Sequence, residues 1–549
     1  MTGMRRIAPF RHSLALSGMC LCLVAGAGPA FAGTPALPAR HIVLDLPGPP
    51  ASIVPADLNE DGRMDLVVAV LYSEYEEMEF EQALGFVQIT EIVPALFERR
   101  QLRAWLRQPD DSYVPAGPPM EMPPSLLAVE AGAGGTPLIA LTDEGISRLR
   151  LSGPSGSAVF VMEPLLTAPP AMRGAGTFIP GLDLLRDLDG EAGEELLLPG
   201  LRGLTVHPAA AGGFGPAAAD PLRLPNDLQG TGSNGNGQWR RYPMPRVEDA
   251  DGDRVPDLLV IDRPGGEDSS ARRVILLRGD GGGRYEAPRT IDVRCPEPLD
   301  EGGELAHAGD LDGDGRAELV FRSDEEDEDD GLDEAREPKG TYRFHHLGPD
   351  LTPQRLPYAT LDVVGHGFGG AFPHFSGGEF RDLDGDGRRD LLTLTLDFSV
   401  MQVVRVLATK KFGMKLHFQP WAQGPDGSFS KVPGQDLSAK FLVDLDNFKM
   451  SRLPLFAGDF DGDRALDFVE MTGGRAVRIR RGHPGCSYSP DADWELKLEE
   501  EPQDPGLLRV ADLDGDGLSD LSLTRPLDTE NDGATAPVKV DLYLSRGAR

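Results

Sequence analysis

The second half of the chain contains an acidic segment that reads Asp382-Leu383-Asp384-Gly385-Asp386-Gly387-Arg388-Arg389-Asp390-Leu391. Carboxylates occupy positions 1, 3, 5 and 9 of this segment, and glycines occupy positions 4 and 6. Alternate residues of a tight turn can face inward, so such a loop can surround a cation with oxygen atoms, while the glycines relieve strain in the turn. The apolar residues that follow the loop predict a β-strand.

The same loop recurs along the chain, with first residues Asp57, Asp187, Asp249, Asp310, Asp382, Asp459 and Asp512. By subtraction, successive copies start 130, 62, 61, 72, 77 and 53 residues apart, so the first interval is about twice the others. A degenerate eighth copy, residues 130–139, divides that interval and keeps the glycines and the apolar exit without the carboxylates. Repeats of this period indicate a repeat architecture.

Each repeat reads as four strands. The apolar runs after the loops are Leu66–Val70, Leu196–Leu198, Leu258–Ile261, Leu319–Phe321, Leu391–Leu396, Phe468–Met471 and Leu521–Leu523. Turns that carry an aromatic residue recur downstream at Asp111–Tyr113, Gly213–Phe214, Gly283–Tyr285 and Gly427–Phe429. A repeat of about 60 residues with four antiparallel strands is typical of a β-propeller blade. We therefore predict an all-β fold, a single propeller of eight blades over residues 33–549. Seven blades is the alternative if the degenerate copy is an insertion.

The sequence resembles the FG-GAP/VCBS repeat family, whose blades also build the head of integrin α subunits. The resemblance rests on the pattern Asp-x-Asp-Gly-Asp-Gly-x-x-Asp-Leu, which is matched with Asp-Leu-Asp-Gly-Asp-Gly at 310, 382 and 512. Residues Gly367–Pro373 are also similar to the family's Phe-Gly and Gly-Ala-Pro signature. The resemblance covers nearly all of residues 40–549. It implies a calcium-binding propeller and no particular activity, because folds of this kind host many functions.

The two ends of the repeat region predict how the ring closes. A strand at His41–Leu46 precedes the first loop, and Val538–Leu544 is the third strand of a last blade that lacks its fourth. If the N-terminal strand supplies that fourth strand, no open sheet edge remains there. Two insertions, at 73–100 and 397–413, fall between the second and third strands of their blades. Loops on a rigid scaffold often bind partners, and decoration without a role is the alternative.

The seven intact loops supply the candidate metal ligands. They are Asp57, Asn59, Asp61 and Asp65; Asp187, Asp189, Glu191 and Glu195; Asp249, Asp251, Asp253 and Asp257; Asp310, Asp312, Asp314 and Glu318; Asp382, Asp384, Asp386 and Asp390; Asp459, Asp461, Asp463 and Asp467; Asp512, Asp514, Asp516 and Asp520. The loop at 187 is the weakest, with Ala192 at a glycine position, whereas Arg254 and Arg464 are expected to strain position 6.

Calcium is the ion that this ligand set predicts. It takes 6–8 oxygen ligands at about 2.3–2.6 Å, whereas Mg²⁺ demands stricter octahedral geometry and Zn²⁺ prefers His or Cys, which the loops lack. The loops are not EF-hands, because the closing Glu at position 12 is missing. Several carboxylates in one loop repel each other, so bound calcium is expected to stabilise the fold as a structural ion.

Composition excludes one class of partner. The chain has 54 basic and 88 acidic residues, a formal net charge of −34, and much of the acidic excess lies in the repeated loops. No basic stripe is present that could neutralise phosphates, so we expect no nucleic-acid partner. The content of 40% hydrophobic and 26% charged residues is typical of a folded protein.

Residues 1–32 are interpreted as a secretory signal. Arg5, Arg6 and Arg11 precede an apolar stretch, Leu14–Ala27, and Ala30-Phe31-Ala32 predicts cleavage after Ala32. The apolar stretch is short for a membrane anchor, and no later segment is a transmembrane candidate. Cleavage removes three basic residues, which gives the mature chain a charge of −37 (51 − 88). We therefore expect a secreted protein, extracellular or periplasmic.

Two cysteines, Cys295 and Cys486, remain in the mature chain. An oxidising compartment permits a disulfide between them. The propeller would place them three repeats apart, which favours two unpaired thiols.

The sequence contains no Gly-x-Ser-x-Gly, His-Glu-x-x-His, Walker or Cys-x-x-Cys motif, and we assign no catalytic residue. His345, His346, His366 and His374 surround the fifth intact loop, either as a metal or catalytic group or as ordinary surface residues. Three functions remain open. The first is a binding or adhesion module for a protein or glycan; the others are a lyase-like enzyme on extracellular polysaccharide and an envelope scaffold. A basic or His-lined pocket on the axis would favour the enzyme.

Overall fold

The computed structural model describes residues 34–48, 50–72, 99–132, 137–170, 183–191, 193–200, 202–222, 230–231, 238–239, 244–262, 272–286, 289–293, 303–324, 337–348, 352–367, 379–398, 411–432, 437–444, 449–450, 455–471, 475–499, 508–525 and 538–547. Several predicted features lie outside these residues. They are the predicted signal sequence, residues 73–98 and 399–410 of the two insertions, residues 368–373 of the Phe-Gly signature, Cys295 and His374. The described part is all-β, and no helix in it is suited to crossing a membrane.

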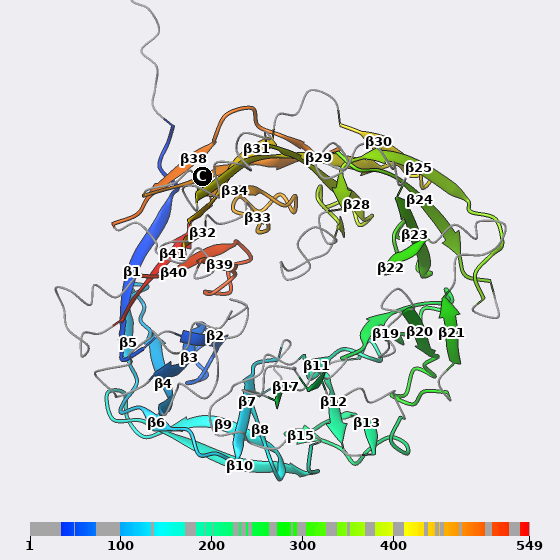
Figure 1. The fold of residues 1–549 in the computed structure, drawn as a ribbon. Coiled ribbons are helices and arrows are strands. Elements are labelled where there is room, and N and C mark those ends of the chain that lie inside the picture. The colour runs from blue at the N-terminus through cyan, green and yellow to red at the C-terminus, as the bar shows by residue number, and fades with distance from the viewer. Residues whose placement is uncertain are drawn as a thin grey trace, which may run out of the picture.

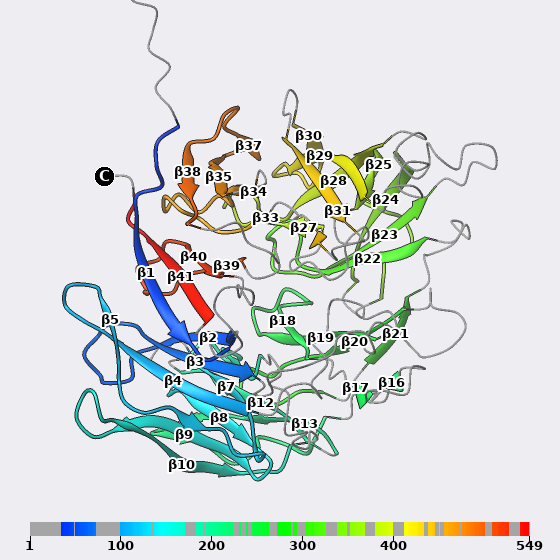
Figure 2. The same ribbon diagram turned by 60° about the vertical axis from the view of Figure 1, so that its left-hand side comes forward.

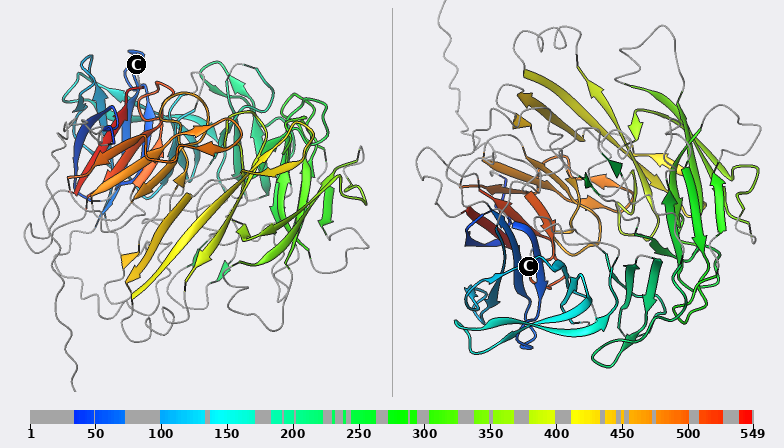
Figure 3. Two further views of the ribbon diagram at one scale, coloured as in Figure 1. Left: turned by 90° about the horizontal axis from the view of Figure 1, so that it is seen from above. Right: turned by 60° about the horizontal axis from the view of Figure 1, so that its bottom comes forward.

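Eight antiparallel sheets follow one another around a ring, which makes the molecule an eight-bladed β-propeller (Figures 1 and 3). We number the blades in the order of their acidic loops. The degenerate copy contributes a complete four-stranded sheet of its own, so the prediction of eight blades is confirmed and the seven-bladed alternative is wrong.

The first four blades contain β2–β21. Blade 1 consists of β2 (Pro50–Ala56), β3 (Asp65–Tyr72), β4 (Arg99–Arg107), β5 (Tyr113–Pro115) and β6 (Met120–Glu121). Blade 2 consists of β7 (Leu126–Glu130), β8 (Ile139–Thr142), β9 (Gly145–Ser152) and β10 (Val159–Thr167). Blade 3 has β11 (Leu185–Arg186), β12 (Glu195–Gly200) and β13 (Gly203–His207), with the hairpins β14 (Ala209–Ala210)–β15 (Gly213–Phe214) and β16 (Gly230–Thr231)–β17 (Gln238–Trp239) nearby in the chain. Blade 4 consists of β18 (Arg246–Glu248), β19 (Asp257–Asp262), β20 (Arg272–Leu277) and β21 (Arg289–Val293).

The other four blades contain β22–β41 and β1. Blade 5 consists of β22 (Glu304–Gly309), β23 (Glu318–Asp324), β24 (Lys339–His346) and β25 (Ala359–Val364). Blade 6 consists of β26 (His366–Gly367), β27 (Phe380–Arg381), β28 (Asp390–Asp397), β29 (Lys411–Gln423), β30 (Phe429–Lys431), β31 (Leu437–Asp444) and β32 (Lys449–Met450). Blade 7 has β33 (Leu455–Phe456), β34 (Phe468–Met471), β35 (Ala476–Arg480) and β38 (Trp494–Lys497), with the hairpin β36 (Gly482–His483)–β37 (Ser487–Tyr488). Blade 8 consists of β39 (Leu508–Ala511), β40 (Asp520–Thr524), β41 (Val538–Ser545) and β1 (Ala39–Leu46).

The N-terminal strand closes the ring as predicted. β1 pairs antiparallel with β41 along its whole length, from Ala39 opposite Ser545 to Leu46 opposite Val538. In Figures 1 and 2 the blue strand β1 accordingly lies beside the red strand β41. Both predicted insertions also fall where expected, because β3 and β4 flank the first one and β28 and β29 flank the second.

The hydrophobic core is divided into eight layers, one between each pair of neighbouring blades. Successive residues of a strand face opposite neighbours, as in β3, where Val67 packs toward blade 2 and Leu66 and Val68 pack toward blade 8. Both faces of each central strand are therefore buried, which explains why these strands read as continuous apolar runs rather than as an alternation.

The aromatic turns join adjacent blades. Tyr285, Phe214 and Phe429 come from the turns of blades 4, 3 and 6, and each packs into the layer shared with the preceding blade. The Phe429 ring stacks on Phe344 of blade 5, with 4.8 Å between the ring centroids. The recurrence of an aromatic residue in these turns thus follows from its contact with the blade before it.

Candidate metal centres in the acidic loops

The acid at position 9 anchors each loop to its blade. In all seven loops this side chain is buried, with an exposed fraction of at most 1%. One carboxylate oxygen accepts a hydrogen bond from the backbone N–H at position 2, through the pairs Leu58–Asp65, Leu188–Glu195, Ala250–Asp257, Leu311–Glu318, Leu383–Asp390, Phe460–Asp467 and Leu513–Asp520. In six loops the other oxygen accepts one from the N–H of Arg107, Ala209, Gly279, Gln423, Gly482 or Ser545. In the remaining loop, Nδ1 of His346 lies 3.2 Å from Glu318 Oε1.

The acid at position 1 organises the turn itself. Asp382 accepts hydrogen bonds from the N–H groups of Gly385 at 2.7 Å and Gly387 at 2.9 Å, and the other intact loops repeat all or part of this arrangement. Gly385 and Gly387 adopt φ values of 75° and 89°, which favour glycine. Arg254 and Arg464 adopt φ values of 69° and 75° at position 6, so the expected strain is present.

In several loops the carboxylate groups lie close to one another. Oxygen atoms from positions 1, 3 and 9 lie within 4.8 Å of one another in the loops at 187, 249 and 310, as do atoms from positions 1, 3 and 5 in the loop at 382. Even the loop predicted to be weakest therefore brings Asp187, Asp189 and Glu195 together. An ion with several oxygen ligands fits such a group, because it can contact all three carboxylates at once.

Two carboxylate oxygens provide a direct test of this fit. Oδ1 of Asp461 and Oδ1 of Asp514, both at position 3, are buried and have no hydrogen-bond partner in the described part of the chain. Their Oδ2 atoms are held by arginine, Asp461 by Arg481 at 3.3 Å and Asp514 by Arg107 and Arg546 at 3.0 and 2.9 Å. A buried carboxylate oxygen without a partner is costly, and a cation within the loop would supply the missing contact.

Burial disfavours the charged form of the closing acids. It raises the pKa of Asp65, Asp257 and Asp390 to about 6, of Asp467 and Asp520 to about 7, and of Glu318 to about 9. Backbone hydrogen bonds oppose these shifts, whereas neighbouring carboxylates of the same loop add to them. A divalent cation would reverse the balance, because it stabilises the ionised carboxylate.

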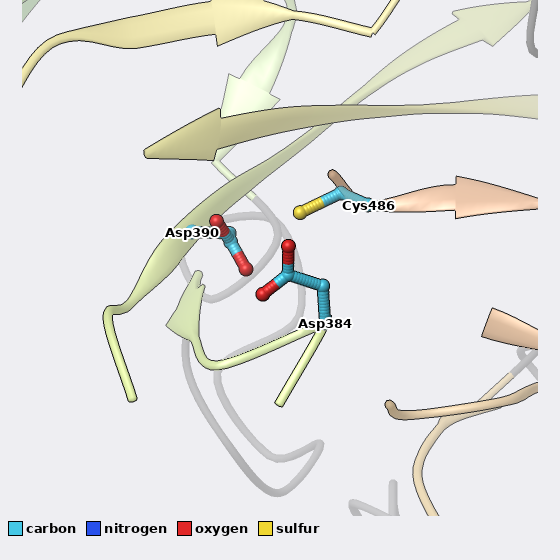
Figure 4. A group of neighbouring side chains, drawn as sticks. All are labelled: Asp384, Asp390 and Cys486. Atoms are coloured by element: carbon cyan, nitrogen blue, oxygen red, sulfur yellow. The ribbon is translucent and has the colours of Figure 1, made fainter. Parts of the chain in front are cut away.

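One loop receives a side chain from the next blade. Cys486, from the turn between β36 and β37 in blade 7, directs its sulfur toward Asp384 and Asp390 of blade 6 (Figure 4). The N–H of Gly485 donates to Asp384 Oδ2 at 2.6 Å. Burial, together with the adjacent Asp390 carboxylate, raises the pKa of the Cys486 thiol, so the thiol stays protonated and its S–H group donates a hydrogen bond to Asp390.

Sequence reasoning identified Cys486 as a thiol but did not place it beside an acidic loop. Cys486 follows the loop by about 100 residues and belongs to another blade, so only the three-dimensional arrangement reveals it. Among the described residues Cys486 is a free cysteine.

Neighbouring loops are joined through their main chains. The N–H at position 8 donates to a carbonyl oxygen at position 1 or 2 of the loop before it, in the pairs Ala317–Ala250 at 3.3 Å, Arg389–Leu311 at 2.7 Å, Leu466–Leu383 at 2.8 Å and Ser519–Asp459 at 2.7 Å. Five consecutive loops, from blade 4 to blade 8, therefore form one connected belt.

Three of the four grouped histidines lie in the described part of the chain, and the contacts given for them differ. His345 is buried and contacts the carbonyl oxygen of Gln354 at 2.8 Å. His346 instead stacks on Tyr358, with 4.0 Å between ring centroids, and reaches Glu318. His366 begins β26 in the next blade.

The degenerate loop keeps the strand pairing of the intact ones but not the closing acid. Ile139 pairs with Glu130 as Asp65 pairs with Ala56, so an apolar residue stands where the intact loops have their buried acid. The anchor of the loop is therefore lost.

Comparisons with known proteins find solved structures of low sequence identity. No curated protein sequence matches the chain. Among solved structures, an Agrocybe aegerita lectin, described for its recognition of non-reducing terminal N-acetylglucosamine, is 14% identical, with a TM-score of 0.38 over 92% of this chain and 95% of the lectin. A Lactobacillus plantarum protein is 10% identical, with a TM-score of 0.28 over 80% and 98%. The V. cholerae biofilm matrix protein Bap1 is 12% identical, with a TM-score of 0.26 over 94% and 89%.

At these values none of the three structures assigns an activity to this chain. The family model described as FG-GAP-like repeat matches residues 249–321, which run from the acidic loop of blade 4 to β23 of blade 5. The chain therefore contains an FG-GAP-like repeat, set within an eight-bladed propeller.

Proposed function

We propose that the protein is a secreted, calcium-binding β-propeller that serves as a binding or adhesion module for a protein or glycan partner, with calcium as a structural ion. The observation that supports this proposal is the gathering of carboxylate oxygens within 4.8 Å in loops of separate blades. The unpartnered oxygens of Asp461 and Asp514 support it further. Oxygen-only ligands in a flexible loop suit Ca²⁺ better than Mg²⁺.

A structural role follows from where the loops lie. Each one connects the first two strands of a blade, and its closing acid also reaches the third strand or the segment just after it. An ion in the loop would hold three strands and relieve the repulsion between the carboxylates. Since the ion would bind the folded chain and not the unfolded one, it stabilises the fold by mass action.

The test is thermal unfolding of residues 34–549 with calcium, with magnesium and after calcium depletion. We expect Tm to rise clearly with calcium and less with magnesium. The variant Asp384→Asn/Asp386→Asn should lose one bound ion in a calorimetric calcium titration, whereas Asp362→Asn, an exposed acid in β25, should lose none. An unchanged Tm and no measurable calcium binding would overturn the proposed metal.

The binding role needs a separate measurement. Calcium-loaded protein is applied to a panel of glycans and of surface proteins, with calcium-depleted protein as the control. Retention of a defined partner that requires the calcium-loaded ring supports the module. A calcium-stabilised protein that retains nothing on either panel would leave a scaffold role as the better account.

A further inference from the structure

The first strands of several blades carry arginines. In Figure 1 the first strands of their blades, such as β2, β22 and β39, lie on the inner side of the ring. Equivalent strands hold Arg246 in blade 4, Arg381 in blade 6 and Arg509 in blade 8. Each arginine donates to a main-chain carbonyl of the following blade, through Arg246–Ala308 at 3.1 Å, Arg381–Phe456 at 3.0 Å and Arg509–Ala51 at 3.1 Å.

Two of these arginines form no ion pair with any described residue, although the chain has a net charge of −34. They are Arg246, which has the Glu248 carboxylate near it but beyond ion-pair distance, and Arg509. Both side chains are exposed to solvent, yet surrounding protein lowers the pKa of both guanidinium groups by desolvation. A guanidinium group that reaches solvent while protein surrounds it fits the inner side of a ring better than an outer surface. We therefore place Arg246 and Arg509 on the inner wall of the ring.

A third blade extends this basic wall. Arg389 of blade 6 lies 3.0 Å from Glu248 of blade 4 and 3.5 Å from Nε2 of His307 in blade 5. His307 is buried, and its pKa is lowered by burial and by the two nearby arginines, Arg246 and Arg389. The imidazole is therefore neutral, and among the described residues Glu248 is the one carboxylate that Arg389 contacts. With two arginines and one carboxylate, the cluster keeps a net positive charge.

We propose that this inner wall, defined by Arg246, Arg389 and Arg509, binds an acidic polysaccharide. Guanidinium groups recognise carboxylates through paired hydrogen bonds. β18 and β39 are edge strands of their sheets, so one side of each main chain has no strand partner among the described residues and can bind hydroxyl groups. A chain that is both anionic and rich in hydroxyl groups matches both features.

Other macromolecules match the wall less well. A protein partner would need an apolar centre in its interface, and a single-stranded nucleic acid would need aromatic rings for stacking. The residues that define the wall are charged. The arginines also stand in different blades, so a polymer with repeated charges can contact several of them, whereas a small anion can contact one.

The inference rests on the proposed function, and its probe is a short hyaluronan oligosaccharide with its carboxyl-reduced counterpart. Calcium-loaded residues 34–549 are titrated with each by calorimetry at low and at moderate salt. We expect binding of the carboxylated sugar alone, weaker at higher salt. Arg246→Gln and Arg509→Gln should each weaken it about 5- to 20-fold, because glutamine keeps a hydrogen-bond donor and removes the charge.

The control variant is Arg150→Gln, which removes an exposed arginine from β9 of blade 2, where it pairs with Glu163. It should change affinity less than twofold. Tm and calcium binding of every variant are measured alongside, so that a folding defect is recognised as such.

Each of the remaining outcomes would contradict one part of the two proposals. If calcium stabilises the protein but hyaluronan does not bind, the proposal for the inner wall is wrong and the proposed function still stands. Equal affinity of wild type and both inner variants would do the same. Equally tight binding of poly-glutamate or DNA would show that the wall selects charge and not a glycan. Arginine-dependent binding by a chain that calcium does not stabilise would overturn the calcium role alone.

Discussion

At the scale of single residues, the acidic loop depends on backbone conformations that few side chains tolerate. Glu60, Arg254 and Arg464 stand at positions 4 or 6 with φ between 59° and 75°, where other loops have glycine. A non-glycine residue in this region costs about 1–2 kcal/mol. The glycines of the family pattern therefore reflect a conformational requirement. The three residues that replace them lower the stability of the folded chain.

Two glycines of one loop, at positions 4 and 6, distinguish backbone strain from steric crowding. A Cβ at Gly387 would meet nothing within 4 Å, whereas one at Gly385 would lie 2.8 Å from the main chain of Arg464 in the next blade. We expect Gly387→Ala to lower the free energy of unfolding by about 1 kcal/mol, and Gly385→Ala to lower it by clearly more. Chemical denaturation of both calcium-depleted variants checks this. Equal losses would show that the contact between the two loops is not tight.

The closing acids predict an unusual dependence on pH. Their folded pKa values, about 6 for Asp65 and about 7 for Asp467, lie above the ordinary carboxyl value of about 4. Their contribution to stability is thus complete below pH about 4 and is lost as pH rises through about 6 to 7. We expect Tm of calcium-depleted protein to fall over this window. Tm of calcium-loaded protein should rise over it, because calcium binds the ionised form. Melting curves from pH about 4 to 8 test both; parallel curves would contradict the assignment.

At the scale of elements, the turn after the third strand fastens one blade to the preceding one. Phe429 stacks on Phe344 and lies near Phe380, so its ring belongs to the layer between blades 5 and 6. We expect Phe429→Ala to cost about 2–4 kcal/mol, somewhat below a fully buried phenylalanine. Leu356→Ala, at a side chain 73% exposed, should change stability by less than about 0.5 kcal/mol. Similar small losses for both would mean that the turns do not join the blades.

The elements also show what could be predicted from sequence. The strand after each acidic loop, the turn aromatics and the paired ends Ala39–Leu46 and Val538–Ser545 follow from local patterns. Contacts between blades do not, because nothing local relates Cys486 to Asp384 or Arg107 to Asp514. Proximity in sequence also says little about the histidines, because adjacent residues of a strand, such as His345 and His346, point to opposite faces.

At the scale of the whole molecule, stability depends on closure. β1 supplies the edge strand of blade 8, and its Leu44 and Leu46 are buried in the layer between blades 8 and 1. We expect a chain that starts at residue 47 to lose cooperative unfolding and to self-associate through the uncovered β41. Residues 34–549 are the control. Calorimetry and gel filtration measure both forms, and a monomer with an unchanged Tm would show that the ring is held without its closing strand.

The antiparallel pairing of β1 with β41 also has a mechanical consequence. Ala39 lies opposite Ser545, so the chain enters and leaves blade 8 at the same end of the sheet. A load applied between the two ends of the chain would peel the strands apart one pair at a time, instead of shearing all the pairs together. Under tension between its ends, the ring is thus expected to open at its seam at low force, whereas a load carried through one end alone leaves the seam unstressed.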